Sequence, residues 1–146
     1  GWTIINDSNR KDMFMDMIRQ MDMSYSYKPV LIKAILLYAD DKGRIKLDDI
    51  VSYFKSYYEG RRTAGLPVEK KNSIFAKGGY TDKEAERNIL SNPFKRFEDM
   101  QMLRHTKTLG IIQVEETVWK HLTAEEKDEI ERIRKKYRYV SLVFGT

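Results

Sequence analysis

The chain has 146 residues, of which 41% are hydrophobic and 34% are charged, and it contains no cysteine. A chain of this length can bury one sizeable core without covalent cross-links, and the lack of cysteine excludes disulfides and thiolate zinc sites. The formal net charge of +5 permits binding to phosphate backbones. No apolar run approaches the roughly 20 residues that span a bilayer, so we expect a cytoplasmic protein without membrane association.

Residues 1–23 are predicted to form a methionine-rich amphipathic helix. Asp7 or Ser8 can cap it, and apolar residues recur at i, i+3 and i+4 as far as Met21. Such a face packs against the rest of the domain. Alternatively, because methionine side chains are adaptable, it docks onto a partner.

Residues 24–123 are predicted to form a winged-helix-like domain. A helix after Pro29 carries a wide apolar stripe, which indicates a central position. The turn Asp40–Gly43 leads into a short edge strand, 44–46, and Asp48 or Asp49 can cap the next helix. Helix, short strand and helix form the first half of a winged helix.

A polar, glycine-punctuated connection occupies residues 60–80, and connections of this length are often functional or mobile. Its Ile74–Phe75 pair is expected to pack on the core. Thr81 and Glu84 match a capping box, so a helix follows with its apolar positions turned inward.

The segment 92–114 carries the features expected of a recognition unit. Asn92–Pro93 is a helix-start signal, and Phe94, Phe97 and Met100 lie on one face of that helix. Two apolar runs, 102–103 and 111–114, then flank a polar bridge, 105–108, which predicts a hairpin with its turn there. The predicted fold class is therefore mainly α (α+β), a winged-helix-like domain with a small β-hairpin and flanking terminal helices.

The region after Thr117 closes the domain with a short helix or a strand extension. A second capping box, Thr123 and Glu126, opens a charged helix that runs to about Tyr137. Its narrow apolar stripe and interleaved charges predict a solvated helix packed on one side. The apolar end, 139–144, adds a strand or meets a partner, so residues 124–146 form a C-terminal charged helix and apolar tail.

Nucleic-acid binding, with duplex DNA as the expected ligand, is the function that these patterns favour. In a winged helix the recognition helix enters a groove and the wing touches the backbone, and basic side chains supply affinity through counterion release. The candidate contacts are Lys83, Arg87, Lys95, Arg96, Arg104, His105 and Lys107, with Arg61, Arg62, Lys70 and Lys71 as a second basic strip. Clustered tyrosines can stack on bases, but their helical spacing favours core packing.

Catalysis is not expected of this chain. Glu69, Lys70 and Lys71 form the E-x-K half of a nuclease signature, with Asp48 or Asp49 as a possible upstream acid for Mg²⁺, yet such a short pattern arises by chance in any lysine-rich chain. The two histidines are too few for a zinc site, and no cofactor is predicted. The alternative function is protein docking or homodimerisation through the methionine-rich helix and the apolar C-terminus.

The run MSYSYKPVLIKA, residues 23–34, resembles accessory domains of bacterial restriction and phage-defence proteins. It is most similar to the segment C-terminal to the motor in superfamily II (DEAD/DEAH-box) helicase-like proteins, and the phrases at 54–62, 68–73 and 92–97 fit the same resemblance. This resemblance covers about residues 23–123. It implies a non-catalytic helper that positions DNA or docks onto sibling helicase domains of a longer chain. No ATPase or nuclease motif of that family is present, so no catalytic residue is carried over.

Overall fold

The computed structural model describes residues 5–68 and 73–144. The described chain is mainly helical with a small three-stranded antiparallel sheet, as the sequence predicts. The elements are α1 (Arg10–Gln20), a 3-10 turn η1 (Met21–Met23), α2 (Tyr27–Tyr38), β1 (Arg44–Lys46), α3 (Leu47–Thr63), α4 (Ile74–Lys77), α5 (Asp82–Ser91), α6 (Pro93–Asp99), β2 (Leu103–Thr106), β3 (Ile111–Val114), α7 (Glu116–Trp119) and α8 (Ala124–Phe144).

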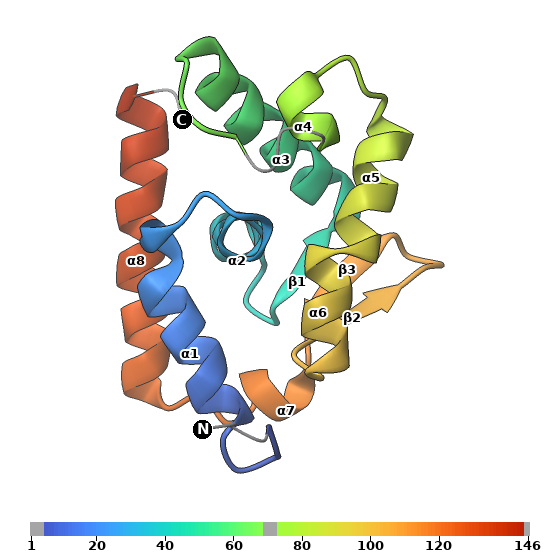
Figure 1. Ribbon diagram of the computed structural model, residues 1–146. Coiled ribbons are helices and arrows are strands. Elements are labelled where there is room, and N and C mark those ends of the chain that lie inside the picture. The colour runs from blue at the N-terminus through green and yellow to red at the C-terminus, as the bar shows by residue number, and fades with distance from the viewer. Residues whose placement is uncertain (1–4, 69–72, 145–146) are drawn as a thin grey trace.

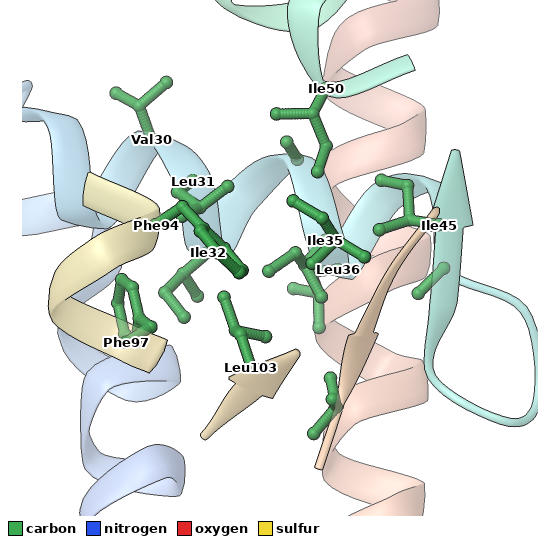
Figure 2. Packing of buried hydrophobic residues seen from close by; sticks show 14 of the residues in the cluster. Val30, Leu31, Ile32, Ile35, Leu36, Ile45, Ile50, Phe94, Phe97 and Leu103 are labelled. Carbon is green, nitrogen blue, oxygen red and sulfur yellow. The ribbon is translucent and has the colours of Figure 1, made fainter. Parts of the chain in front are cut away.

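The helix α2 lies at the centre of the molecule. It is buried along almost its whole length, with α1 and α8 on one side and α5, α6 and the sheet on the other (Figure 1). Figure 2 shows Ile32, Ile35 and Leu36 of α2 directed toward Leu103 and Ile45 of the sheet. Because burying apolar side chains is the dominant favourable term in folding, this continuous apolar helix organises the core, and the predicted central position is confirmed.

The sheet has the strand order β1-β3-β2. Ile45 of β1 pairs with Ile112 of β3, and β3 pairs with β2 so that Leu103 lies opposite Val114. These side chains are buried. Since successive strand residues point to opposite faces, the residues between them, including Arg104 and Gln113, lie on the outer face of the sheet.

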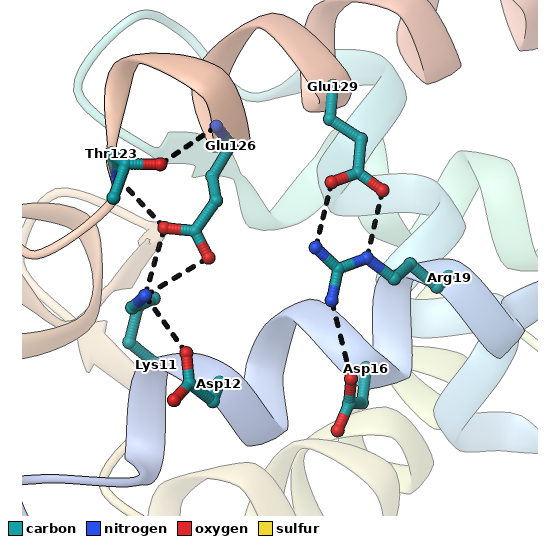
Figure 3. A network of polar contacts seen from close by, with 7 residues as sticks. All are labelled: Lys11, Asp12, Asp16, Arg19, Thr123, Glu126 and Glu129. Carbon is teal, nitrogen blue, oxygen red and sulfur yellow. Dashed lines mark hydrogen bonds and ion pairs between the residues drawn. The ribbon is translucent and has the colours of Figure 1, made fainter.

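The helices α1 and α8 are joined by ion pairs, drawn in Figure 3. The Lys11 ammonium lies 2.9 Å from the Glu126 carboxylate, and the Arg19 guanidinium makes two hydrogen bonds to Glu129, of 2.8 and 2.9 Å. Phe14 of α1 and Ile130 of α8 belong to one hydrophobic cluster with the rest of the core. The predicted terminal segments therefore share a core with residues 24–123.

Several predicted element boundaries are wrong. The cap positions of α1 and α3 are Asn9 and Lys46 rather than an aspartate or serine, and neither side chain makes a cap hydrogen bond. Asp48 and Asp49 lie in the first turn of α3, where they interact favourably with the helix dipole. The charged helix α8 does not end near Tyr137 but continues to Phe144, because no glycine or proline interrupts the sequence before Gly145.

The described parts of the connection 60–80 contain helical structure. The helix α3 extends to Thr63, so Arg61 and Arg62 lie in its last turn rather than in the loop. The short helix α4 buries Phe75, which confirms that this part of the connection packs on the core. The capping box of Thr81 and Glu84 is present at the start of α5.

Candidate nucleic-acid interface

The helix α6 is positioned by its aromatic residues. Pro93, Phe94 and Phe97 are buried and Met100, directly after the helix, is half-buried, so the predicted apolar face is confirmed. Asn92 occupies the cap position, although its side chain makes no cap hydrogen bond. With its apolar face on the core, α6 turns Lys95 and Arg96 outward, and both are exposed.

The two cations of α6 differ in their surroundings. The Lys95 ammonium lies 2.9 Å from an Asp99 carboxylate oxygen and 3.4 Å from Glu98, one helical turn away. Hydrogen bonds to Asp99 and Glu98 raise the pKa of Lys95. Arg96 has no ion pair within the described residues. Lys95 is therefore a charge that the molecule partly neutralises itself, whereas Arg96 is available to an external anion.

The hairpin β2–β3 projects beside α6. Its tip spans residues 107–110, where Gly110 adopts a positive φ of 62°, and Lys107 is exposed at the tip. The turn thus begins two residues later than predicted, since His105 and Thr106 belong to β2. His105 lies opposite Ile112 and its ring meets Phe94 edge-on at 6.0 Å, so it packs on the inner face and does not extend the basic tip.

Arg104 lies on the outer face of the sheet, where the pairing places Arg44 and Arg104 on either side of Gln113. Arg44 is not among the contacts predicted from the sequence, because which residues are neighbours across a sheet depends on strand register. A groove of about 670 Å³ runs over this face. Its cations are Lys42, Arg44, Arg104 and Lys120, and the acids that line it or pair with these arginines are Asp40, Asp41, Glu115 and Glu116. The charges balance, so the groove does not by itself attract a polyanion.

The helix α5 contributes Lys83 and Arg87. Both side chains are exposed, and neither has an ion pair in the part of the chain that the structure describes. The helix faces the core through Ala85 and Ile89. Figure 1 shows α5, α6 and the hairpin together on the side of α2 that faces away from α8, so these cations are carried by neighbouring elements.

Arg61 and Arg62, the described part of the second basic strip, do not belong to this surface. The Arg61 guanidinium lies 4.6 Å from the centre of the Tyr25 ring and donates to the Pro67 carbonyl, and Arg62 pairs with Glu59. Both arginines lie at the end of α3 farthest from the hairpin (Figure 1). Lys70 and Lys71, together with Glu69 of the E-x-K pattern, fall outside the described residues.

Most of the clustered tyrosines that were considered for stacking on bases pack in or against the hydrophobic core instead. Tyr27 and Tyr58 are buried and pack against each other edge-on at 5.8 Å, and Phe75 lies 5.2 Å from the Tyr58 ring. Tyr53 and Tyr57 are half-buried, and burial raises the pKa of both hydroxyls. Packing is therefore their main role in this fold.

No group of three histidine, aspartate or glutamate side chains within residues 5–68 and 73–144 is placed to hold a metal ion. In the same residues, no helix combines the length and the apolar character needed to cross a membrane. The chain matches no protein-family model, no curated protein and no solved structure.

Proposed function

We propose that this chain is a non-catalytic nucleic-acid-binding domain that engages duplex DNA through α5, α6 and the β2–β3 hairpin. The observation that carries the proposal is a set of exposed cations on these neighbouring elements that have no ion pair within the described residues: Lys83, Arg87, Arg96 and Lys107. We call these four residues the hairpin-side cations. Unpaired surface cations bind phosphates at little cost, because no internal partner must be displaced.

The order of the elements supports this assignment. We take the succession α2, β1, α3, α5–α6, β2, β3, with strand order β1-β3-β2, as a winged-helix arrangement, and this is part of the proposal. In that plan the helix before the hairpin approaches a groove and the hairpin touches the backbone. Under this proposal Arg96 of α6 and Lys107 of the hairpin both contact phosphates.

The dimensions and charge of α6 limit what it can read. Its seven residues span only about 10 Å, which is less than two turns of helix within a groove. Its outer face also carries Glu98 and Asp99, which repel phosphates. We therefore expect binding of modest strength with little sequence preference, dominated by backbone contacts.

Salt-dependent titration tests the proposal. With four phosphate contacts the logarithm of the binding constant should fall against the logarithm of salt with a slope of about −3.6. The double variant Arg96→Ala/Lys107→Ala should reduce that slope by about 1.8. The matched control is Lys28→Ala/Lys127→Ala, which removes the same charge from exposed positions on α2 and α8.

Two outcomes of this titration reject the proposal. One is equal affinity and equal slope for the two double variants, because then the position of the charge would not matter. The other is a wild-type chain that fails to bind a duplex even at low salt.

The proposed context is a longer helicase-like or restriction-type chain in which this domain positions DNA for a motor. Reading the full open reading frame tests this part, since ATPase motifs upstream of the segment are expected. The alternative of docking through the methionine-rich helix has less structural support. Met15 and Met21 are buried and Met13 and Met17 pack against the core, so most of that face is already covered by the chain itself.

A further inference from the structure

The densest positive charge in the chain lies in the second half of α8, away from the hairpin. Between residues 132 and 138 there are five basic residues and no acidic one. The first half of the same helix is predominantly acidic. The sequence alone indicates a solvated charged helix, and the structure shows that these five cations have two different roles.

Two of the five anchor the helix. Arg134 donates from Nε to the Leu36 carbonyl at 2.9 Å and from Nη2 to the Ala39 carbonyl, and Arg138 donates to the Leu37 carbonyl at 3.3 Å. These carbonyls lie at the end of α2, where a helix lacks internal partners. Arg134 and Arg138 therefore hold this part of α8 in place on the most buried helix of the molecule.

The other three face outward. Arg132, Lys135 and Lys136 are exposed and have no ion pair in the described chain, and Tyr139 is 65% exposed. Their spacing of i, i+3, i+4 and i+7 places them on one side of a helix, opposite the side that packs inward through Ile130. We call these four residues the α8 basic stripe.

The helix dipole does not account for this stripe. The favourable interaction of cations with a helix dipole is confined to the last turn, whereas Lys136 lies about two turns before the end of α8 at Phe144. Arg132 and Lys136 are like charges at i and i+4, which repel each other. The nearby carboxylate of Glu129 is already engaged by two hydrogen bonds from Arg19. Arg132 also attracts the Glu129 carboxylate, and Asp128 and Glu131 lie four residues before Arg132 and Lys135. The stripe is therefore a concentration of positive charge that the acidic half of α8 compensates only in part.

We propose that the α8 basic stripe is a second nucleic-acid contact surface that binds the phosphate backbone. Binding to a polyanion would relieve the repulsion between the cations, and the Tyr139 hydroxyl can donate to a phosphate oxygen. A membrane surface fits less well, because an interfacial helix inserts an apolar face, and Ile130, Ile133 and Tyr137 of α8 pack against the core. The inference rests on the proposed function, but it concerns a different face, since α8 and the hairpin lie on opposite sides of α2 (Figure 1).

The test uses the whole chain and a fluorescent duplex of roughly 20 base pairs, titrated at several salt concentrations between about 50 and 200 mM. The variant is Arg132→Ala/Lys135→Ala/Lys136→Ala, which keeps good helix formers along α8. If each residue contacts a phosphate, the salt slope falls by up to about 2.7. Over that salt range the wild-type chain then loses about 40-fold more affinity than the variant. The control is Lys28→Ala/Lys77→Ala/Lys127→Ala, with circular dichroism as a check of folding.

The outcomes separate the two proposals. A slope that changes in the stripe variant alone supports the stripe and rejects the hairpin-side cations as the binding surface. A slope that changes only in Arg96→Ala/Lys107→Ala overturns the stripe and leaves the proposed function standing. A slope equal in the stripe variant and its triple control also overturns the stripe. Stripe-dependent binding to phosphatidylserine vesicles without any effect on DNA binding overturns it in favour of a membrane surface.

Discussion

Phe97 is the residue through which the position of α6 can be tested most directly. Its side chain is fully buried, and it lines a surface groove of about 350 Å³ together with Ile32 of α2 and Met21. Replacing a buried phenylalanine by alanine costs about 3–5 kcal/mol, through lost apolar burial and the cavity that remains. Because the new cavity would open into the groove and admit solvent, we expect a value at the lower end, about 3 kcal/mol.

Urea unfolding monitored by circular dichroism measures this free energy of unfolding. For a domain of this length a loss of about 3 kcal/mol lowers the melting temperature by roughly 6–12 °C. The control is Glu98→Ala, the exposed neighbour on the same helix, which should change stability by less than about 0.5 kcal/mol. A Phe97→Ala variant as stable as the control would show that α6 does not pack on α2 as described, and the outward direction of Arg96 would lose its basis.

Two further predictions concern a turn and a capping box. Gly43 has φ +76°, and a Cβ there would lie 3.2 Å from the Trp119 ring, so Gly43→Ala should lower the free energy of unfolding by about 1–3 kcal/mol. Gly110 also has a positive φ but faces open space, so Gly110→Ala should lower the free energy of unfolding by less than Gly43→Ala does. Equal losses for the two variants would refute the close approach of residue 43 to the Trp119 ring. The hydrogen bond from the Thr123 backbone N–H, and to a smaller extent the one from Lys11, lowers the pKa of Glu126 below its ordinary value of 4.5. The stability that this carboxylate contributes is therefore present above pH 4.5 and is lost as the pH falls through the lowered pKa. Urea midpoints of wild type and Glu126→Gln should therefore differ at pH 7, and this difference should shrink as the pH is lowered below 4.5. A difference that stays constant with pH would contradict the assignment.

Lys95 and Arg96 differ in whether a neighbouring carboxylate already pairs with the cation, and this decides whether it is free to bind a phosphate. Both are exposed neighbours on α6, but Lys95 has acidic residues at i+3 and i+4, on its own side of the helix. Arg96 is rotated about 100° from Lys95 around the helix axis. Asp99 is also at the i+3 position of Arg96, but it pairs with Lys95, and Arg96 has no ion pair among the described residues. Sequence spacing offers both cations an acidic neighbour, so the structure decides which of the two is paired.

Local sequence patterns determined most of the secondary structure. Both capping boxes are formed, the second with hydrogen bonds between Thr123 and Glu126 of 2.9 and 3.1 Å. The apolar faces of α2 and α6 and the existence of the hairpin were also predicted correctly. Each of these features depends on residues within about one helical turn or one strand pair, and such patterns are encoded within short windows of sequence.

The tertiary structure alone decided which candidate cations remain free. Arg61 was predicted to be a nucleic-acid contact, but in the fold its guanidinium lies over the Tyr25 ring. His105 was predicted to lie in the hairpin turn, but the strand register directs its ring toward Phe94. Arg134 is bound to the end of α2, almost 100 residues earlier in the chain. The physical reason is that a cation can bind an external ligand only if no residue distant in the sequence already pairs with it. Such distant contacts depend on helix packing and strand register, not on the residues next to the cation in the sequence.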